Sequence, residues 1–300
     1  MTGDGTTTAS TTPTTPIAPT TPAPTAGGLA TGGGSGPSGA SAFPRLLAME
    51  WTKFRSVRST VYSLLIFVVV TLGLVLLITS LTVHGWDTLD ADRRAAYLRD
   101  PVGSILGTGL GLGQLAICVL GTMIITSEYS TGMIRASLLA VPKRYPVLAA
   151  KGLVFAVVTF VIGEIVSFGA FGIGAPILHS KVKVAISDPG VLRALVGTGL
   201  YLMMLGLFAM AVGTLIRHTA GAITGVIAFV LVLAPLAQLL PGSVGKHIHA
   251  YLPTEAGQLV GQSVQGPKDL LSPWQGYGVF CLWTAVLLIL AGWVLERRDA

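Results

Sequence analysis

The segment that follows the second apolar run carries the side chains best suited to contact a partner. It contains Glu128 and Tyr129, then Gly132 and Arg135, followed by further basic residues. Glu128 stands near the start of a possible short helix, where the helix dipole favours a negative charge. The mixture of charged and apolar residues would let this loop dock a partner while lying on a membrane. A solvated connection is the alternative, and the residues by themselves leave both open.

A second candidate segment, 43–60, has the pattern of an amphipathic helix. At about 100° per residue its large apolar side chains fall on one narrow stripe: Phe43, Leu47, Trp51 and Phe54. Lys53 and Arg55 lie at the flanks of that stripe. This pattern predicts an interfacial helix with aromatic rings among lipid head groups and basic residues toward phosphates. A plain cytoplasmic extension of the first membrane span is the alternative.

Polar residues inside apolar runs form a third set of candidates. Glu164 lies in the middle of the third run, where a charge costs at least ~2.5 kcal/mol unless it is paired or hydrated. It is either part of a substrate or proton pathway or a packing residue. Glycines crowd the second run at Gly107, Gly109, Gly111 and Gly113. Close helix packing, rather than a gate, is the expected reason for these glycines.

Several kinds of catalytic site are missing from the sequence. It has no G-x-x-x-x-G-K-[ST] phosphate loop, no H-E-x-x-H motif and no G-x-S-x-G elbow. His247 and His249 lack a third ligand and make at most a weak metal site. We therefore expect no catalytic residues, no metal and no cofactor on this chain, and we expect it not to be an enzyme.

The composition shows what must position these residues. Charged residues make up 11% of the 300 residues and hydrophobic ones 52%, whereas soluble proteins carry about 25% charged residues. Too few charges are present to cover a soluble surface, so the chain is predicted to be an all-α membrane protein. Six apolar runs are long enough to cross a bilayer: 61–83, 104–126, 148–173, 194–216, 220–240 and 276–295. Only three residues separate the fourth and fifth runs, which predicts a tight helical hairpin.

Residues 1–42 form a separate block rich in Thr, Pro and Gly, with a single charge at Asp4. Such a block has almost nothing to bury, so we expect a disordered tail, followed by a transmembrane domain over 43–300. With the amino terminus inside, inner segments hold eleven Lys and Arg residues and outer segments eight. This excess predicts that both termini are cytoplasmic. The net charge of +6 points to membrane lipids rather than nucleic acid, because the basic residues lie between apolar runs.

The order and spacing of these motifs resemble a known family. Glu128-Tyr-x-x-Gly132-x-Ile-Arg135, the Glu50-x-x-Lys-x-Arg-Ser56 stretch and the run 251–257 are similar to the permease subunit of type-2 ABC exporters. The resemblance is closest to stand-alone permeases of actinobacteria, and it touches nearly all of residues 45–300. Met133 stands where that family usually has threonine.

This resemblance implies a six-span half-transporter that forms a homodimer in the bacterial plasma membrane. It also implies a separately encoded ABC ATPase as partner, which binds the ATP and magnesium. Contacts that couple the permease to the ATPase fall on Glu128, Tyr129, Gly132 and Arg135, and the elbow helix before the first span carries Trp51, Lys53 and Arg55.

Two other functions remain open. A proton-coupled secondary transporter would work through Glu164, although such carriers usually have more intramembrane ionisable groups and broken helices. A membrane scaffold or sensor subunit would move no substrate at all. The substrate itself is not legible in the sequence.

Overall fold

The computed structural model describes residues 39–131, 144–233, 236–237, 239, 242–267 and 269–297, and within them every regular element is a helix. Five of these helices are long and apolar enough to cross a membrane: α2 (Arg58–His84), α4 (Pro101–Ser130), α6 (Arg144–Leu178), α7 (Val191–Ile216) and α12 (Pro273–Arg297). At 1.5 Å per residue each exceeds the ~30 Å hydrocarbon core. This is the pattern of a multi-pass membrane protein.

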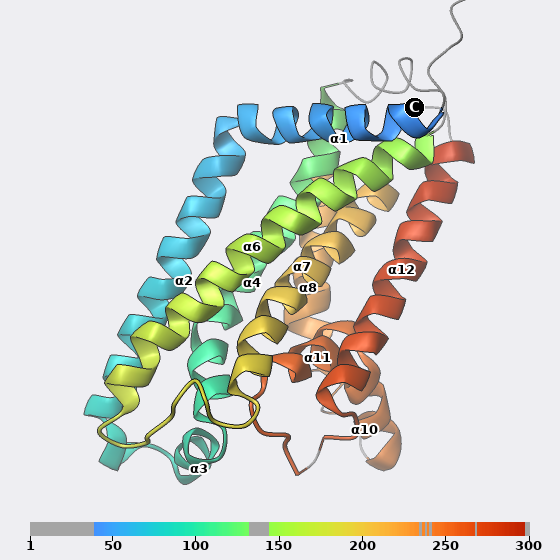
Figure 1. Ribbon diagram of the computed structural model, residues 1–300. Helices are drawn as coiled ribbons and strands as arrows, with labels where there is room; N and C mark the ends of the chain where they lie inside the picture. Colours follow the sequence, from blue (N-terminus) through green and yellow to red (C-terminus); the bar gives the residue numbers. More distant parts are fainter. Residues whose placement is uncertain are drawn as a thin grey trace, which may run out of the picture. The chain divides into compact units, whose positions relative to one another are not determined.

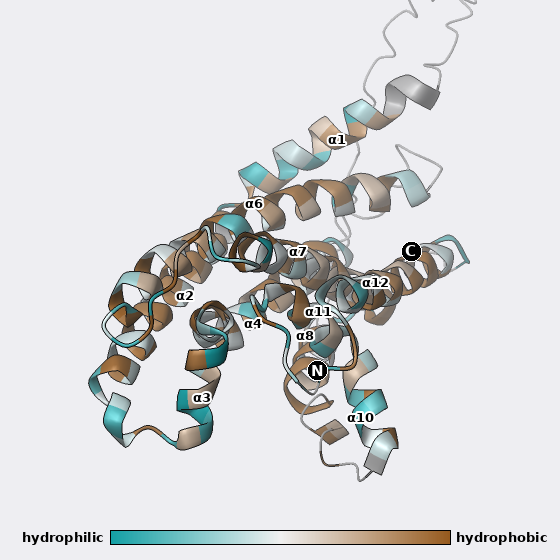
Figure 2. Cartoon of the chain, turned by 60° about the horizontal axis from the view of Figure 1, so that its bottom comes forward, coloured by the Kyte–Doolittle hydropathy of each residue, from teal (hydrophilic) through white to brown (hydrophobic). Residues whose placement is uncertain are grey.

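The outer surfaces of the long helices are as apolar as a bilayer requires. On α2, for example, Leu65, Ile66 and Val69 are each about 60% exposed, at 60%, 59% and 62%. Figure 2 shows hydrophobic colour along most of the long helices, with hydrophilic stretches on α1, α3 and α10. Continuous apolar surface of this extent is rare on soluble monomers, so lipid is the expected solvent for these faces.

Shorter helices close the two ends of the bundle (Figure 1). Helix α1 (Gly39–Ser56) lies across one end, which we call the α1 end, and α12 finishes there too. The other end, the α3 end, holds the remaining short elements: η1 (Trp86–Thr88), α3 (Ala91–Arg99), α10 (Gly242–Tyr251), α11 (Pro253–Gln258) and η3 (Leu259–Gly261). The amphipathic helix expected over 43–60 is thus present, but it begins at Gly39 and ends at Ser56.

The fifth predicted span, 220–240, is shorter than expected among the described residues. Helix α8 (Thr219–Ala228) continues into a π-helical turn, η2 (Phe229–Leu233), giving 15 residues or about 22 Å. The tight hairpin before it is confirmed: α7 ends at Ile216, and Arg217 takes a left-handed conformation with φ 59°. Much of 234–241 lies outside the described residues, so the count of six spans stays a prediction.

Helix α7 is the centre of the bundle and packs against α4, α6 and α12. Glycines bring α4 and α7 into close approach: a Cβ on Gly121 would lie 2.5 Å from the carbonyl oxygen of Gly206. Large side chains then fill the interior beside them, among them Tyr201, Leu205 and Phe280. Small residues set the helix spacing here, as is usual between helices in membranes.

The glycines of the second span have two different roles. Gly109 and Gly113 face α2, where an added Cβ would clash with Val75 or Thr71, so close packing explains them as expected. Gly107 and Gly111 have nothing within 4 Å of a Cβ and face open space. The packing explanation is therefore wrong for this second pair.

Candidate functional site

The α1 end of the bundle holds a buried group of charged residues, and helix α1 is what brings it together. Leu46 of α1 packs with Val147 and Ala150 of α6, so the helix lies against the start of α6. The helical pattern then breaks at Val57, which has an extended backbone, and α2 leaves in a new direction. This arrangement turns Glu50, one turn after Leu46, toward the bundle, where it is 3% exposed.

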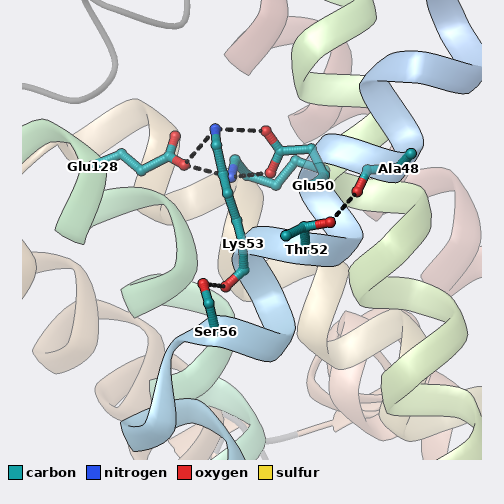
Figure 3. A network of polar contacts seen from close by, with 7 residues as sticks. Ala48, Glu50, Thr52, Lys53, Ser56 and Glu128 are labelled. Atoms are coloured by element: carbon teal, nitrogen blue, oxygen red, sulfur yellow. Dashed lines mark hydrogen bonds and ion pairs between the residues drawn. The ribbon is translucent and has the colours of Figure 1, made fainter.

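Four charged side chains from three helices meet at this point (Figure 3). The ammonium group of Lys151, on α6, lies 2.6 Å from Glu50 Oε2 and 2.7 Å from Glu128 Oε1, at the end of α4. The ammonium of Lys53, one turn along α1, lies 2.9 Å from Glu50 Oε1 and 3.5 Å from Glu128 Oε1. We call Glu50, Lys53, Glu128 and Lys151 the charge cluster.

The charge cluster is electrically balanced and largely shielded from solvent. Its two carboxylates and two ammonium groups sum to zero, and the side chains of Glu50 and Lys151 are only 3% and 5% exposed. Lys53 is the most exposed member, at 24%. Burial by itself lowers the pKa of Lys53, but the carboxylates of Glu50 and Glu128 outweigh that effect and raise its pKa above the usual value.

Such an arrangement is expected to hold the three helices together. Charge-assisted bonds of 2.6–2.9 Å are strong where water is excluded, and removing one member of a buried ion pair costs about 3–5 kcal/mol. A displacement of α1 alone would separate these charges. The start of α6, the end of α4 and α1 are therefore expected to move as one body.

A cavity of about 330 Å³ opens beside the charge cluster, between α1 and α2 on one side and α4 and α6 on the other. Its polar lining includes Ser56, Ser63 and Ser127 in addition to the charge cluster. Most of its remaining wall is apolar, with Met123 and Phe155 among the lining residues. The cavity reaches Thr131, the last residue described before the loop 132–143.

Tyr129 connects the same end of α4 to the next pair of helices. The guanidinium carbon of Arg217 lies 5.2 Å from the centre of the Tyr129 ring, which is within the range of a cation–π contact. Arg217 ends α7 in a left-handed turn, and the ring nitrogen Nδ1 of His218 then caps α8 by accepting a bond from the Gly221 N–H. The α7–α8 turn is thereby joined to the segment that carries Glu128.

The structure brings together part of the predicted site. Glu128 and Lys53 meet in the charge cluster, and Tyr129 lies beside them on α4. Trp51 and Arg55 are on the opposite, exposed face of α1, and Trp51 is 49% exposed. The apolar stripe expected on α1 thus has one exposed member, Trp51, whereas Leu47 and Phe54 are half-buried. Gly132 and Arg135 lie outside the described residues.

Glu128 differs from a typical contact residue, because its carboxylate faces Lys151 and Lys53 inside the protein. Its whole residue is 8% exposed. We therefore expect Glu128 to influence a partner protein indirectly, by fixing the position of the loop that follows it. Glu50 and Lys151 complete the charge cluster. The sequence showed them only as parts of family-like stretches, and neither was predicted to be a site residue. The available signal was Lys151 itself, a cation inside a predicted span, which requires a nearby carboxylate.

Glu164 lies apart from the charge cluster, in the middle of α6. Its carboxylate touches α7 at Gly199, and within the described part of the chain neither of its oxygens has a hydrogen-bond partner. It lines neither the cavity beside the charge cluster nor the cavity at the α3 end described below. A carboxylate in this position fits either expectation for Glu164, a packing residue or part of a substrate or proton pathway.

The charge cluster offers little to a metal ion or to catalysis. Both carboxylates are already bound by lysine ammonium groups. No group of three or more metal-binding side chains occurs among the described residues, and His249 contacts Glu255 at 3.2 Å. What the arrangement provides is a rigid connection between helices, beside an amphipathic cavity.

Comparison with known proteins adds no family assignment. No family model matches the sequence, and no curated protein matches it.

Proposed function

We propose that the chain is the permease subunit of an ABC exporter, which forms the substrate path and is driven by a separately encoded ATPase. In this proposal two copies form a homodimer in the bacterial plasma membrane. The α1 end faces the cytoplasm, so both termini are cytoplasmic. The ATPase binds there, against the loop 132–143 and the surface of α1.

The charge cluster is the observation that carries this proposal. An exporter driven from the cytoplasm needs a rigid element that converts movement of its ATPase into movement of membrane helices. Lys151 and Glu128 join the start of α6 to the end of α4, while Glu50 attaches α1 to α6 and Lys53 attaches α1 to α4. The loop 132–143 connects those same two helices. A force applied to this loop or to α1 would reach two spanning helices directly.

A sixth crossing by α8 and η2 belongs to the same proposal. Helix α7 finishes at the α1 end, whereas α12 begins at the α3 end, so the chain must return between them (Figure 1). The apolar helix Thr219–Leu233 lies on that return path. Six crossings would leave α1 and the end of α12 on one side of the membrane.

Affinity purification of the tagged full chain in mild detergent tests the proposal. We expect a stoichiometric ATP-binding protein to purify with it. Arg135→Ala, in the loop, should reduce that recovery at least about tenfold, which corresponds to 1.4 kcal/mol of lost binding. Glu50→Gln should reduce ATPase stimulation by weakening the connection between α1 and α6 while leaving the loop sequence intact.

Glu296→Gln is the matched control, because Glu296 is an exposed carboxylate near the same end, on α12. It should leave recovery of the ATPase unchanged. Melting temperatures of all variants separate loss of contact from loss of fold. A folded chain that purifies alone would exclude the ABC permease, and normal recovery with Arg135→Ala would exclude the loop as the contact.

Glu164 supports a second candidate, a proton-coupled transporter. Its buried carboxylate oxygens have no hydrogen-bond partner among the described residues, and such groups in a membrane frequently carry protons. Under this candidate Glu164→Gln abolishes transport that is driven by a proton gradient. Under the ABC proposal the same variant keeps ATP-dependent transport.

A further inference from the structure

The α3 end of the bundle contains a second cavity, of about 170 Å³, that neither the charge cluster nor the expected coupling residues use. It lies between α4, α7 and the short pair α11 and η3. On α4 its lining runs from Gly103 to Gln114, a distance of about 16 Å along the helix axis. The cavity therefore extends from the membrane surface toward the middle of the bilayer.

The wall formed by α11 and η3 is unusual for a membrane protein. These two elements are short, they do not cross the membrane, and Thr254, Ala256 and Val260 within them are at most 1% exposed. Irregular backbone at this depth is tolerated where it is buried in protein or lines a cavity. Here it does both, because Gln258, Gly261 and Gln262 face the cavity.

The polar groups of the cavity are all uncharged. None of its eleven lining residues is an acid or a base. The hydroxyl of Tyr201 donates to Gln114 Oε1 at 2.7 Å and accepts from Gln258 Nε2 at 3.3 Å. Tyr201 is fully buried at 2% exposure, so this chain of bonds fixes two amide groups at the cavity. Amides offer both donors and acceptors to a ligand.

Asp100, which lies next to the cavity at the start of α4, has its carboxylate oxygens occupied by hydrogen bonds within the protein. It accepts these bonds from the N–H groups of Gly103 and Ser263 and from the Ser263 hydroxyl. The side of the cavity along α4 is formed by Gly107 and Gly111, which leave it open. An apolar chain could follow these glycines, while the enclosed volume is below the ~300 Å³ of a pocket for a whole drug-sized ligand.

We propose that this cavity binds the uncharged, hydroxyl-bearing head group of an amphiphile, as in an alkyl glycoside. Hydroxyl groups donate and accept hydrogen bonds and so match the amides of Gln114, Gln258 and Gln262. A charged head group would lose its hydration without gaining an opposite charge. A role of this site in substrate transport rests on the proposed function, whereas ligand binding at the site does not.

A cysteine placed in the cavity tests binding directly. Gly107→Cys fits, because a Cβ at this position has nothing within 4 Å. The full chain in lipid nanodiscs is labelled with a maleimide, and labelling at residue 107 is followed by mass spectrometry. Hexyl glucoside at about four times its Kd should slow labelling about fivefold, because only the free fraction reacts. Hexyltrimethylammonium and hexanoate, with similar apolar chains, should have little effect.

Gly278→Cys is the matched control, because Gly278 also has open space for a Cβ and lies near the α3 end but lines no part of the cavity. Its labelling should not respond to any probe.

Two further measurements test the site. Gln258→Leu should abolish the protection at residue 107. The melting temperature of the unmodified chain should rise with the glucoside and with neither charged probe. Three outcomes would overturn the proposal: a cysteine at position 107 that does not react, equal protection by all three probes, or stronger protection by a charged probe. If the chain purifies without an ATPase but still binds the glucoside, the binding site is supported and the ABC transport mechanism is excluded.

Discussion

At the scale of single residues, the most informative feature is a set of charges placed where charges are expensive. Glu50, Glu128 and Lys151 are each less than 10% exposed, and within the described residues their ion pairs are with one another and with Lys53. A buried ion network rarely adds net stability over an apolar core of the same shape. We expect its value to lie in specificity, because an arrangement of α1, α4 and α6 that pairs these charges is favoured over one that leaves a charge buried and unpaired.

Removing one charge from this cluster should therefore cost more than removing two opposite ones. Lys151→Met leaves Glu50 and Glu128 to share Lys53 and should destabilise the protein by about 3–5 kcal/mol. Adding Glu50→Gln to that variant restores charge balance and should recover part of the loss. Melting temperatures of the wild type, both single variants and the double variant measure this coupling. The coupling would be contradicted if the effects of the two substitutions on melting temperature were strictly additive, or if Lys151→Met left the melting temperature unchanged.

At the scale of elements, glycine position decides how closely two helices approach. Gly109 of α4 faces α2, where an added Cβ would lie 2.6 Å from Val75 Cγ2 and 3.0 Å from the Thr71 carbonyl oxygen. Gly111, two residues later, faces open space. Glycine in the same helix is thus required for close packing at position 109, whereas at position 111 it lines the cavity.

This difference predicts opposite outcomes for one substitution at two positions. Gly109→Ala should destabilise the protein by about 1–3 kcal/mol through overpacking against α2. Gly111→Ala should be neutral or stabilising by up to about 1 kcal/mol, because alanine favours the helix over glycine. Thermal unfolding of the two variants in the same detergent compares them directly. Equal losses at both positions would show that helix packing at Gly111 is also tight.

At the scale of the whole molecule, the arrangement of helices separates two sets of polar residues. The charge cluster and the α7–α8 turn lie at the α1 end, and the uncharged cavity opens near the α3 end (Figure 1). In the proposed exporter the first set receives force from the ATPase, and the second contacts the substrate. Helices α4 and α7 connect the two, because each contributes residues at both ends.

Cysteine labelling of intact cells tests this orientation and the sixth crossing together. In a background with Cys118→Ala and Cys281→Ala, an impermeant maleimide should label Thr88→Cys and Val264→Cys from outside. Thr131→Cys and Ala220→Cys should react only after lysis. All four positions are exposed. Labelling of residues 220 and 264 from the same side would show that α8 and η2 do not cross the membrane.

Local pattern was enough to predict the helical membrane architecture. Long apolar runs can satisfy their backbone in a bilayer only as helices, so the five long helices, the tight turn after Ile216 and the helix before the first span were all legible. The span 220–240 was predicted less well, because length and hydropathy do not reveal that an α-helix changes to a π-helical turn at Phe229. The pattern of α1 did not reveal that Glu50 and Lys53 would contact α6 and α4, since periodicity does not tell which face a neighbouring helix will cover.

The sequence by itself determined which residues are charged within or beside apolar runs, and therefore which ones need partners. Only the tertiary structure decided which partners they have. Glu50 and Lys151 are 101 positions apart in the chain, yet 2.6 Å separates their charges. The uncharged cavity likewise combines α4, α7 and α11. No local pattern encodes such contacts, because they depend on how helices distant in sequence pack and on the glycines that let them approach.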